Sequence, residues 1–207
     1  PGGLPPMPGH GHQDSGSFEI HYANERLFID VGRGTYEQTT DAEFDVSALS
    51  HNSLTVDLKD PFPQNRPYYD EDFRKNIIGG EPILRSIECG VELEHYGYSR
   101  FKNVGKLSRN WVFTENSMMI RDKIDGKGKR VVSRTLCTTF DVIQTKGKVV
   151  LKKGTNMFYL SYSNVSDLKI ERGTYWIDYG VARPVTRIKM LTRCTLPYSG
   201  NIMVEKK

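Results

Sequence analysis

Residues 118–140 read MMIRDKIDGKGKRVVSRTLCTTF, and this stretch decides the expected fold. Two segments that contain apolar residues, Met118–Ile124 and Arg130–Phe140, flank the turn-forming run Asp125-Gly-Lys-Gly. Two such segments joined by a short glycine-rich turn predict an antiparallel β-hairpin. Because no long 3.6-residue period occurs elsewhere in the chain, we expect an all-β protein.

Further short strands are predicted on both sides of this hairpin. Upstream they cover residues 17–22 and 26–30, which form a second hairpin, then 53–57, 86–96 and a strand that begins at 111–114. Downstream they cover residues 149–152, 157–162, 167–171, 175–179 and 187–195, after a turn at Lys146-Gly147. Short strands every 8–12 residues are typical of sandwiches and open barrels. We predict a large antiparallel two-sheet β-sandwich over residues 17–207, after a Gly/Pro-rich loop over residues 1–16.

The composition excludes several classes of protein. The 207 residues are 37% hydrophobic and 11% aromatic, with a formal net charge of +4. Basic residues are scattered among acidic ones, which argues against a nucleic-acid-binding surface. No apolar run is long enough to predict a transmembrane segment. Three widely separated cysteines, Cys89, Cys137 and Cys194, indicate buried free thiols rather than a disulfide framework or a thiolate zinc site.

Three of the five histidines are candidates for one metal site. His10 and His12 flank Gly11, so both imidazoles would point to the same face of an extended backbone. Asp30 ends the apolar run RLFID, where a buried carboxylate needs a partner, and His51 follows about twenty residues later. Zinc binds imidazole nitrogen and carboxylate oxygen, usually with four ligands. Hydrogen-bonded core residues have the same types, so both interpretations stay open at this point.

Three motifs in the first 57 residues resemble the heparinase II/III group of polysaccharide lyases. They are PGHGHQDSGSFEI at 8–20, LFIDVGRGTY at 27–36 and SALSHNSLTVD at 47–57. In content and order they are similar to the family patterns GHxHxDxxSFEL, D-x-G-x-G-x-Y and S-x-x-x-H-N-x-[VL]-x-V-D. A looser similarity to a hairpin of the family follows in MIRDKIDGKG at 119–128, and the remainder is compatible only in pattern. The resemblance implies the C-terminal β-sandwich region of such an enzyme.

The resemblance also implies roles for individual residues. His12, Asp30 and His51 match the family's zinc ligands, and the single zinc ion is expected to be mainly structural. His10 matches a histidine that lines the catalytic cleft. Tyr36 ends the D-x-G-x-G-x-Y motif and could face that cleft, while a core or strand-end aromatic is the alternative interpretation.

Three further residues are candidate substrate contacts from their own chemistry. Arg33 could pair with a sugar carboxylate, although exposed turn arginines are common. Tyr68 and Tyr69 lie in the long irregular loop expected over residues 58–82, and loops of this length are often functional. Their rings could stack on sugars, or they could be ordinary loop aromatics.

The resemblance implies a second domain. Family members carry an α/α-toroid before the β region, and the toroid supplies the main catalytic Tyr and its helpers. The chain shows no such helical pattern and opens with PGGLPPMPG. We therefore expect part of a larger lyase, whose partners are its own toroid domain and an acidic polysaccharide. The expected reaction is β-elimination at a uronate, with the isolated chain inactive and the parent enzyme periplasmic or extracellular.

Two other classes of function compete with this one. A non-catalytic carbohydrate-binding or interaction module with a structural metal would carry the same ligand residues. A cupin-type metalloenzyme also uses an HxH motif, usually with a Glu four or five residues after the second His. Here Glu19 is seven residues after His12 and the central carboxylate is Asp30, so the spacing disfavours a cupin. The sequence does not name the polysaccharide.

Overall fold

A computed structural model describes residues 10–77 and 79–207, so most of the predicted N-terminal loop lies outside the described residues. Strands account for 56% of the structure and helices for 9%, which confirms the all-β prediction. The strands are β1 (Ile20–Tyr22), β2 (Glu25–Phe28), β3 (Leu54–Val56), β4 (Ile83–Ile87), β5 (Gly90–His95), β6 (Val104–Phe113), β7 (Ser117–Thr138), β8 (Asp141–Thr145), β9 (Lys148–Lys153), β10 (Asn156–Tyr162), β11 (Asp167–Asp178) and β12 (Val181–Lys206). The helices are α1 (Thr40–Val46), α2 (Glu71–Asn76) and the 3-10 helix η2 (Gly97–Arg100).

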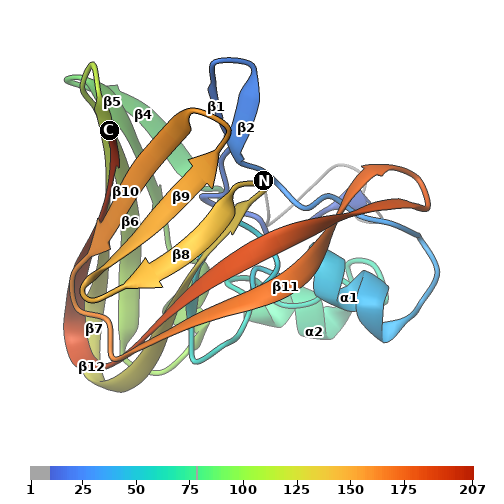
Figure 1. Ribbon diagram of the computed structural model, residues 1–207. Coiled ribbons are helices and arrows are strands. Elements are labelled where there is room, and N and C mark those ends of the chain that lie inside the picture. The colour runs from blue at the N-terminus through green and yellow to red at the C-terminus, as the bar shows by residue number, and fades with distance from the viewer. Residues whose placement is uncertain (1–9, 78) are drawn as a thin grey trace.

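The strands form an antiparallel sandwich around one main core. The large sheet has the order β4-β5-β6-β7-β12-β10-β9-β8, with β3 beside β7 and β11 beside β12, while β1 and β2 form a separate hairpin. The sheet curls over, so that β8, β9 and β10 lie in front of β6 and β7 (Figure 1). Trp111 of β6, Leu151 of β9 and Ile202 of β12 belong to one buried cluster. The two layers therefore bury their apolar faces against each other, as a sandwich requires.

Strand β7 corrects the predicted central hairpin. Residues 118–140 do not turn back at Asp125-Gly-Lys-Gly, because Ser117–Thr138 is one strand of 22 residues. It pairs with β12 on both sides of these glycines, and the register shifts next to them. A Cβ at Gly126 would lie 2.3 Å from the backbone oxygen of Asn103. Glycine in a strand permits such a bulge and close backbone approach, and the long-range pairing with β12 selects it over a turn.

Other predicted boundaries also differ. Residues 86–96 were expected to be one strand, but they contain the end of the β4–β5 hairpin, with its turn at Glu88-Cys89. Cys89 is exposed in that turn, so the prediction of a buried thiol is wrong there and holds for Cys137. Conversely, β11 runs as one strand over Asp167–Asp178, where two strands were predicted. The loop over residues 58–82 contains α2, whose start is capped by Asp70.

The β11–β12 hairpin positions the segment after β2. Figure 1 shows this long hairpin passing alongside α1. The backbone N–H of Trp176 donates to the carbonyl of Val31 at 2.8 Å, and that of Gly180 donates to the carbonyl of Gly34 at 3.0 Å. The D-x-G-x-G-x-Y motif is therefore held by backbone hydrogen bonds to residues almost 150 positions later in the chain.

Candidate metal centre and adjoining cavity

Asp30, which is partly buried, and His51 form a close pair. His51 is fully buried, and its Nδ1 lies 2.9 Å from Oδ2 and 3.1 Å from Oδ1 of Asp30. The carboxylate also accepts hydrogen bonds from the Ser17 hydroxyl at 2.8 Å and the Gly32 N–H at 3.0 Å. Burial alone would raise the pKa of Asp30, but these hydrogen bonds hold that pKa well below its usual range. Asp30 is therefore a charged carboxylate.

Asn52 joins three segments beside this pair. Its Nδ2 donates to the carbonyls of Phe18 at 2.7 Å and Ile29 at 2.8 Å, and its Oδ1 accepts from the N–H of Cys137 at 2.6 Å. The side chain is fully buried and is saturated almost entirely by backbone groups. The His51-Asn52 dipeptide therefore supplies a buried imidazole and, next to it, an amide that joins the three surrounding segments.

Arg109 of β6 supports the same loops. Its Nη1 donates to the carbonyls of Gly16 at 3.0 Å and Asn52 at 2.9 Å. The guanidinium also binds Asp122 of β7 through Nε–Oδ1 at 2.6 Å and Nη2–Oδ2 at 3.2 Å. A two-bond pair of this kind compensates both buried charges. No sequence pattern indicated Arg109, because a buried arginine in a strand leaves no local signal.

His12 is the third predicted ligand. Its ring centroid lies 5.2 Å from that of His51. Burial and the neighbouring His51 lower the pKa of His12, which favours the neutral imidazole that binds metals. The Nε2 atom of His51 is buried without a hydrogen-bond partner among the described residues. Donor chemistry therefore fits zinc. No three His, Cys, Asp or Glu side chains within residues 10–77 and 79–207 already form a metal-holding group, so binding would require these side chains to move closer.

Tyr36 lies between His10 and Tyr179. Its hydroxyl is 3.2 Å from Nδ1 of His10, and its ring stacks on that of Tyr179 with an interplanar angle of 14°. The Arg33 guanidinium carbon lies 4.3 Å from the centroid of the Tyr36 ring. Tyr36 is 51% exposed and Tyr179 is 62% exposed. Tyr36 is therefore a surface residue rather than a core aromatic.

Trp176 packs between the β11–β12 hairpin and the D-x-G-x-G-x-Y motif. Its indole N–H donates to Oδ2 of Asp45 at 2.8 Å, and burial raises the pKa of that carboxyl. A Cβ added at Gly34 would lie 2.3 Å from the indole ring. The second glycine of the motif is thus required by the close approach of a side chain from β11.

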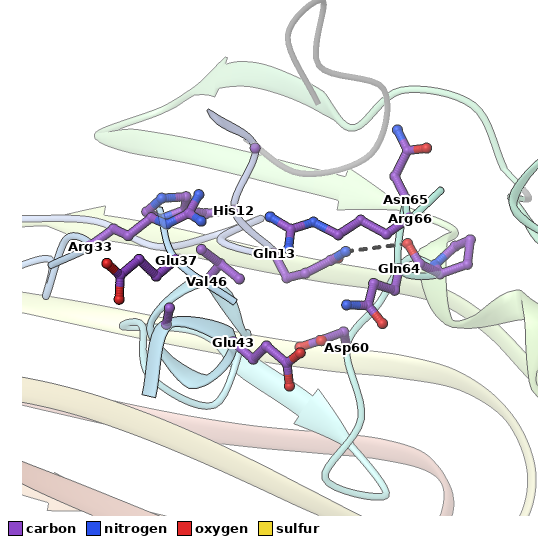
Figure 2. Close-up of a pocket in the computed structure, with 13 residues that line it drawn as sticks. His12, Gln13, Arg33, Glu37, Glu43, Val46, Asp60, Gln64, Asn65 and Arg66 are labelled. Atoms are coloured by element: carbon purple, nitrogen blue, oxygen red, sulfur yellow. Dashed lines mark hydrogen bonds between the residues drawn. The ribbon is translucent and has the colours of Figure 1, made fainter. Parts of the chain in front are cut away.

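A cavity of about 240 Å³ opens beside His12 (Figure 2). Gln13 lies in its wall, where its amide donates to the carbonyl of Pro63 at 3.5 Å. Arg33 and Arg66 contribute guanidinium groups to the cavity. Its acidic residues are Glu37, Glu43 and Asp60.

A family comparison covers nearly the whole chain. Residues 2–201 match the family described as heparinase II/III-like, C-terminal. This chain belongs to that family. The resemblance seen in the first 57 residues therefore extends to the strands that carry Arg109 and Trp176, which no motif had singled out.

Solved structures share the fold of this family member. A heparinase III with methylated lysines superposes with a TM-score of 0.72 at 16% identity, covering 95% of this chain and 30% of its own. A mutant of heparan sulfate lyase HepC from Pedobacter heparinus gives 0.71 at 15% identity, covering 95% and 31%. A further heparinase III gives 0.64 at 15% identity, covering 94% and 30%. The chain thus spans about 30% of the length of these proteins, and the likeness shows the fold. Comparison with curated proteins gave no match.

The remaining predicted contacts of this family member lie apart from the His12 cavity. Tyr68 is 53% exposed. The half-buried Tyr69 packs edge-on against Phe73 of α2, with ring centroids 5.6 Å apart. Neither tyrosine lines the cavity, whereas Arg33 does. In the described residues, no helix is both long and apolar enough to cross a membrane.

Proposed function

We propose that this chain forms one wall of the catalytic cleft of a polysaccharide lyase, which cleaves a uronate-containing acidic polysaccharide by β-elimination. The observation that carries the proposal is the exposed Tyr36–His10 pair, in the same part of the chain as the Asp30–His51 pair. Family membership and the likeness to a heparan sulfate lyase fold support it.

A zinc ion would be held by His12, Asp30 and His51, with a water or a neighbouring group as fourth ligand. Bound zinc would supply mainly structural stabilisation by cross-linking the N-terminal loop, the end of β2 and the segment before β3. The Asp30–His51 contact has hydrogen-bond length. Metal binding needs neutral imidazoles and an ionised carboxylate, so zinc and protons would compete for the site.

His10 and Tyr36 would act at the reacting sugar. β-Elimination transfers the proton next to the uronate carboxyl to a base, forms a carbon–carbon double bond and expels the 4-linked sugar, which takes a proton from an acid. The Tyr36 phenol, hydrogen-bonded to His10, can carry a proton to or from the sugar. Arg33 would pair with a sugar carboxylate, and Tyr68 and Tyr69 would supply stacking surface. The remaining catalytic groups would come from the toroid domain.

The test is the absorbance of the unsaturated uronate product on heparan sulfate, hyaluronan, alginate and bacterial capsular polymers. We expect turnover by the full-length parent and little or none by the isolated chain, because base, acid and carboxylate neutralisation must be positioned together. Tyr36→Phe in the parent should lower kcat by about 10²–10⁴-fold, the usual contribution of a general acid or base. Tyr159→Phe, on the outer face of β10, is the matched control.

Two results would contradict the proposal. Robust turnover by the isolated chain would mean that the catalytic groups lie within it. A parent that binds acidic glycans but releases no product from any of these polymers would favour the non-catalytic carbohydrate-binding module.

A further inference from the structure

The cavity beside His12 is lined by two arginines and three acidic residues. We propose that it binds one acidic sugar residue, whose carboxylate or sulfate lies between Arg33 and Arg66 and whose hydroxyls face the opposite wall. This inference rests on the proposed function and adds Arg66 as a residue that determines which glycan binds.

The two arginines come from separate segments and converge. Arg33 belongs to the motif after β2, and Arg66 belongs to the long loop before α2. Figure 2 shows the Arg66 side chain extending toward the side of the cavity where Arg33 and His12 lie. Each guanidinium is a planar donor that matches the oxygens of a carboxylate or sulfate. Arg66 forms no ion pair with any residue in the described part of the chain. Its charge is therefore available for a ligand.

The opposite wall is acidic and polar. Glu43, Asp60 and Gln64 lie there, away from the two guanidinium groups (Figure 2). Oδ1 of Asp60 already accepts hydrogen bonds from the hydroxyl of Ser47 at 2.9 Å and from a backbone N–H at 2.7 Å. Glu43 and Gln64 remain exposed as acceptors for hydroxyl groups. A free phosphate or sulfate has negative charge on every side and would meet these carboxylates. A sugar with one anionic group and several hydroxyls matches both walls.

The size and the surroundings agree with a single sugar ring. A volume of about 240 Å³ lies below the roughly 300–1,000 Å³ of sites for drug-sized ligands. Arg33 also lies over the ring of Tyr36, which is hydrogen-bonded to His10. A sugar in the cavity would thus sit next to the residues proposed to act on its neighbour in the polymer.

The experiment is calorimetric titration of the 207-residue chain with tetrasaccharides of heparan sulfate, hyaluronan and alginate, each also in carboxyl-reduced form. We expect Arg66→Gln and Arg33→Gln to weaken binding of the preferred tetrasaccharide by about tenfold or more, the effect of losing one charge-assisted hydrogen bond. The matched control, Arg121→Gln on the exposed face of β7, should leave affinity unchanged. If Arg66→Gln no longer weakens binding once the carboxyl groups of the tetrasaccharide are reduced, Arg66 binds a carboxylate. If the weakening persists with carboxyl-reduced heparan sulfate, Arg66 binds a sulfate.

Three results would overturn the inference: no binding of any acidic tetrasaccharide by the wild-type chain, wild-type affinity in Arg66→Gln, or equal losses in Arg66→Gln and Arg121→Gln. In the full-length parent, Arg66→Gln should raise KM, whereas Tyr36→Phe should lower kcat. If the parent is active and Arg66→Gln leaves its KM unchanged, the proposed role of this cavity is wrong and the lyase proposal is unaffected. If the parent is inactive but Arg66→Gln weakens glycan binding, the lyase proposal is wrong and the proposed role of the cavity is supported.

Discussion

Arg109 and Asp122 lie directly opposite each other on β6 and β7, and both side chains are buried. The same guanidinium binds the carbonyls of Gly16 and Asn52. The ion pair thus links the interior of the sandwich to the two loops that carry His12 and His51, and the candidate metal centre depends on a charge pair inside the sandwich.

Asp122→Asn should lower the free energy of unfolding by about 3–5 kcal/mol, because it leaves the Arg109 charge buried without its partner. Urea denaturation measures this. The matched control, Glu71→Gln, breaks an exposed pair with Lys75 and should change little. The double variant Arg109→Met/Asp122→Leu removes both charges and should recover part of the loss. Equal small effects of Asp122→Asn and Glu71→Gln would contradict the role given to Arg109.

His12→Ala should release the proposed zinc. Elemental analysis of tag-free protein should find about one zinc per chain in the wild type, on the four-coordinate expectation. The variant should lose that metal and melt at a lower temperature, since a ligand bound only by the folded state stabilises it by about 2.7 kcal/mol at a hundred times its Kd. His21→Ala, at an exposed histidine on β1, is the control. Unchanged metal content in His12→Ala would reject this ligand assignment.

His95 should make stability depend on pH. It is buried beside Phe62 and Tyr98, and burial together with the nearby Arg109 lowers its pKa from 6.5 to about 4. Its Nδ1 accepts the N–H of Gly97 at 3.2 Å, so the neutral ring is the folded form.

Because the folded pKa is the lower one, the unfolded chain takes up the proton first, and stability falls as the pH drops from about 6.5 toward 4. The loss at pH 5 is about 2 kcal/mol. Denaturation at pH 7 and pH 5 should show this difference in the wild type and a smaller one in His95→Leu. The same pH dependence in both proteins would show that other groups cause it.

Gly34→Ala should displace the β11–β12 hairpin, because the new Cβ would lie 2.3 Å from the Trp176 indole. Overpacking of this kind costs typically about 1–3 kcal/mol, and the Trp176–Asp45 hydrogen bond would be lost as well. Tryptophan fluorescence and denaturation measure both effects. Adding Trp176→Ala to Gly34→Ala removes the clash, so the two substitutions should cost less together than the sum of their separate costs. Strict additivity would contradict the contact.

The sequence by itself determined the fold class and the family. Alternating apolar residues and closely spaced turns are local signals, and they were sufficient for an antiparallel all-β prediction. The motifs around His12, Asp30 and His51 were sufficient for the family resemblance. The Asp30–His51 contact agrees with the grouping of these residues, and their role as metal ligands stays a prediction.

Only the tertiary structure decided how distant segments meet. Whether Asp125-Gly-Lys-Gly turns or bulges depends on pairing with β12, which lies some 70 residues away, and glycines are compatible with both. Arg109 of β6, Trp176 of β11 and Tyr179 in the β11–β12 turn reach the site from distant parts of the chain, and none of them carries a local signal of that role. Alternation specifies which face of a strand is buried, but it does not specify the partner strand. Arg33 and Arg66 line the same cavity because of the strand pairing and the course of two loops. No local sequence pattern predicts that they meet.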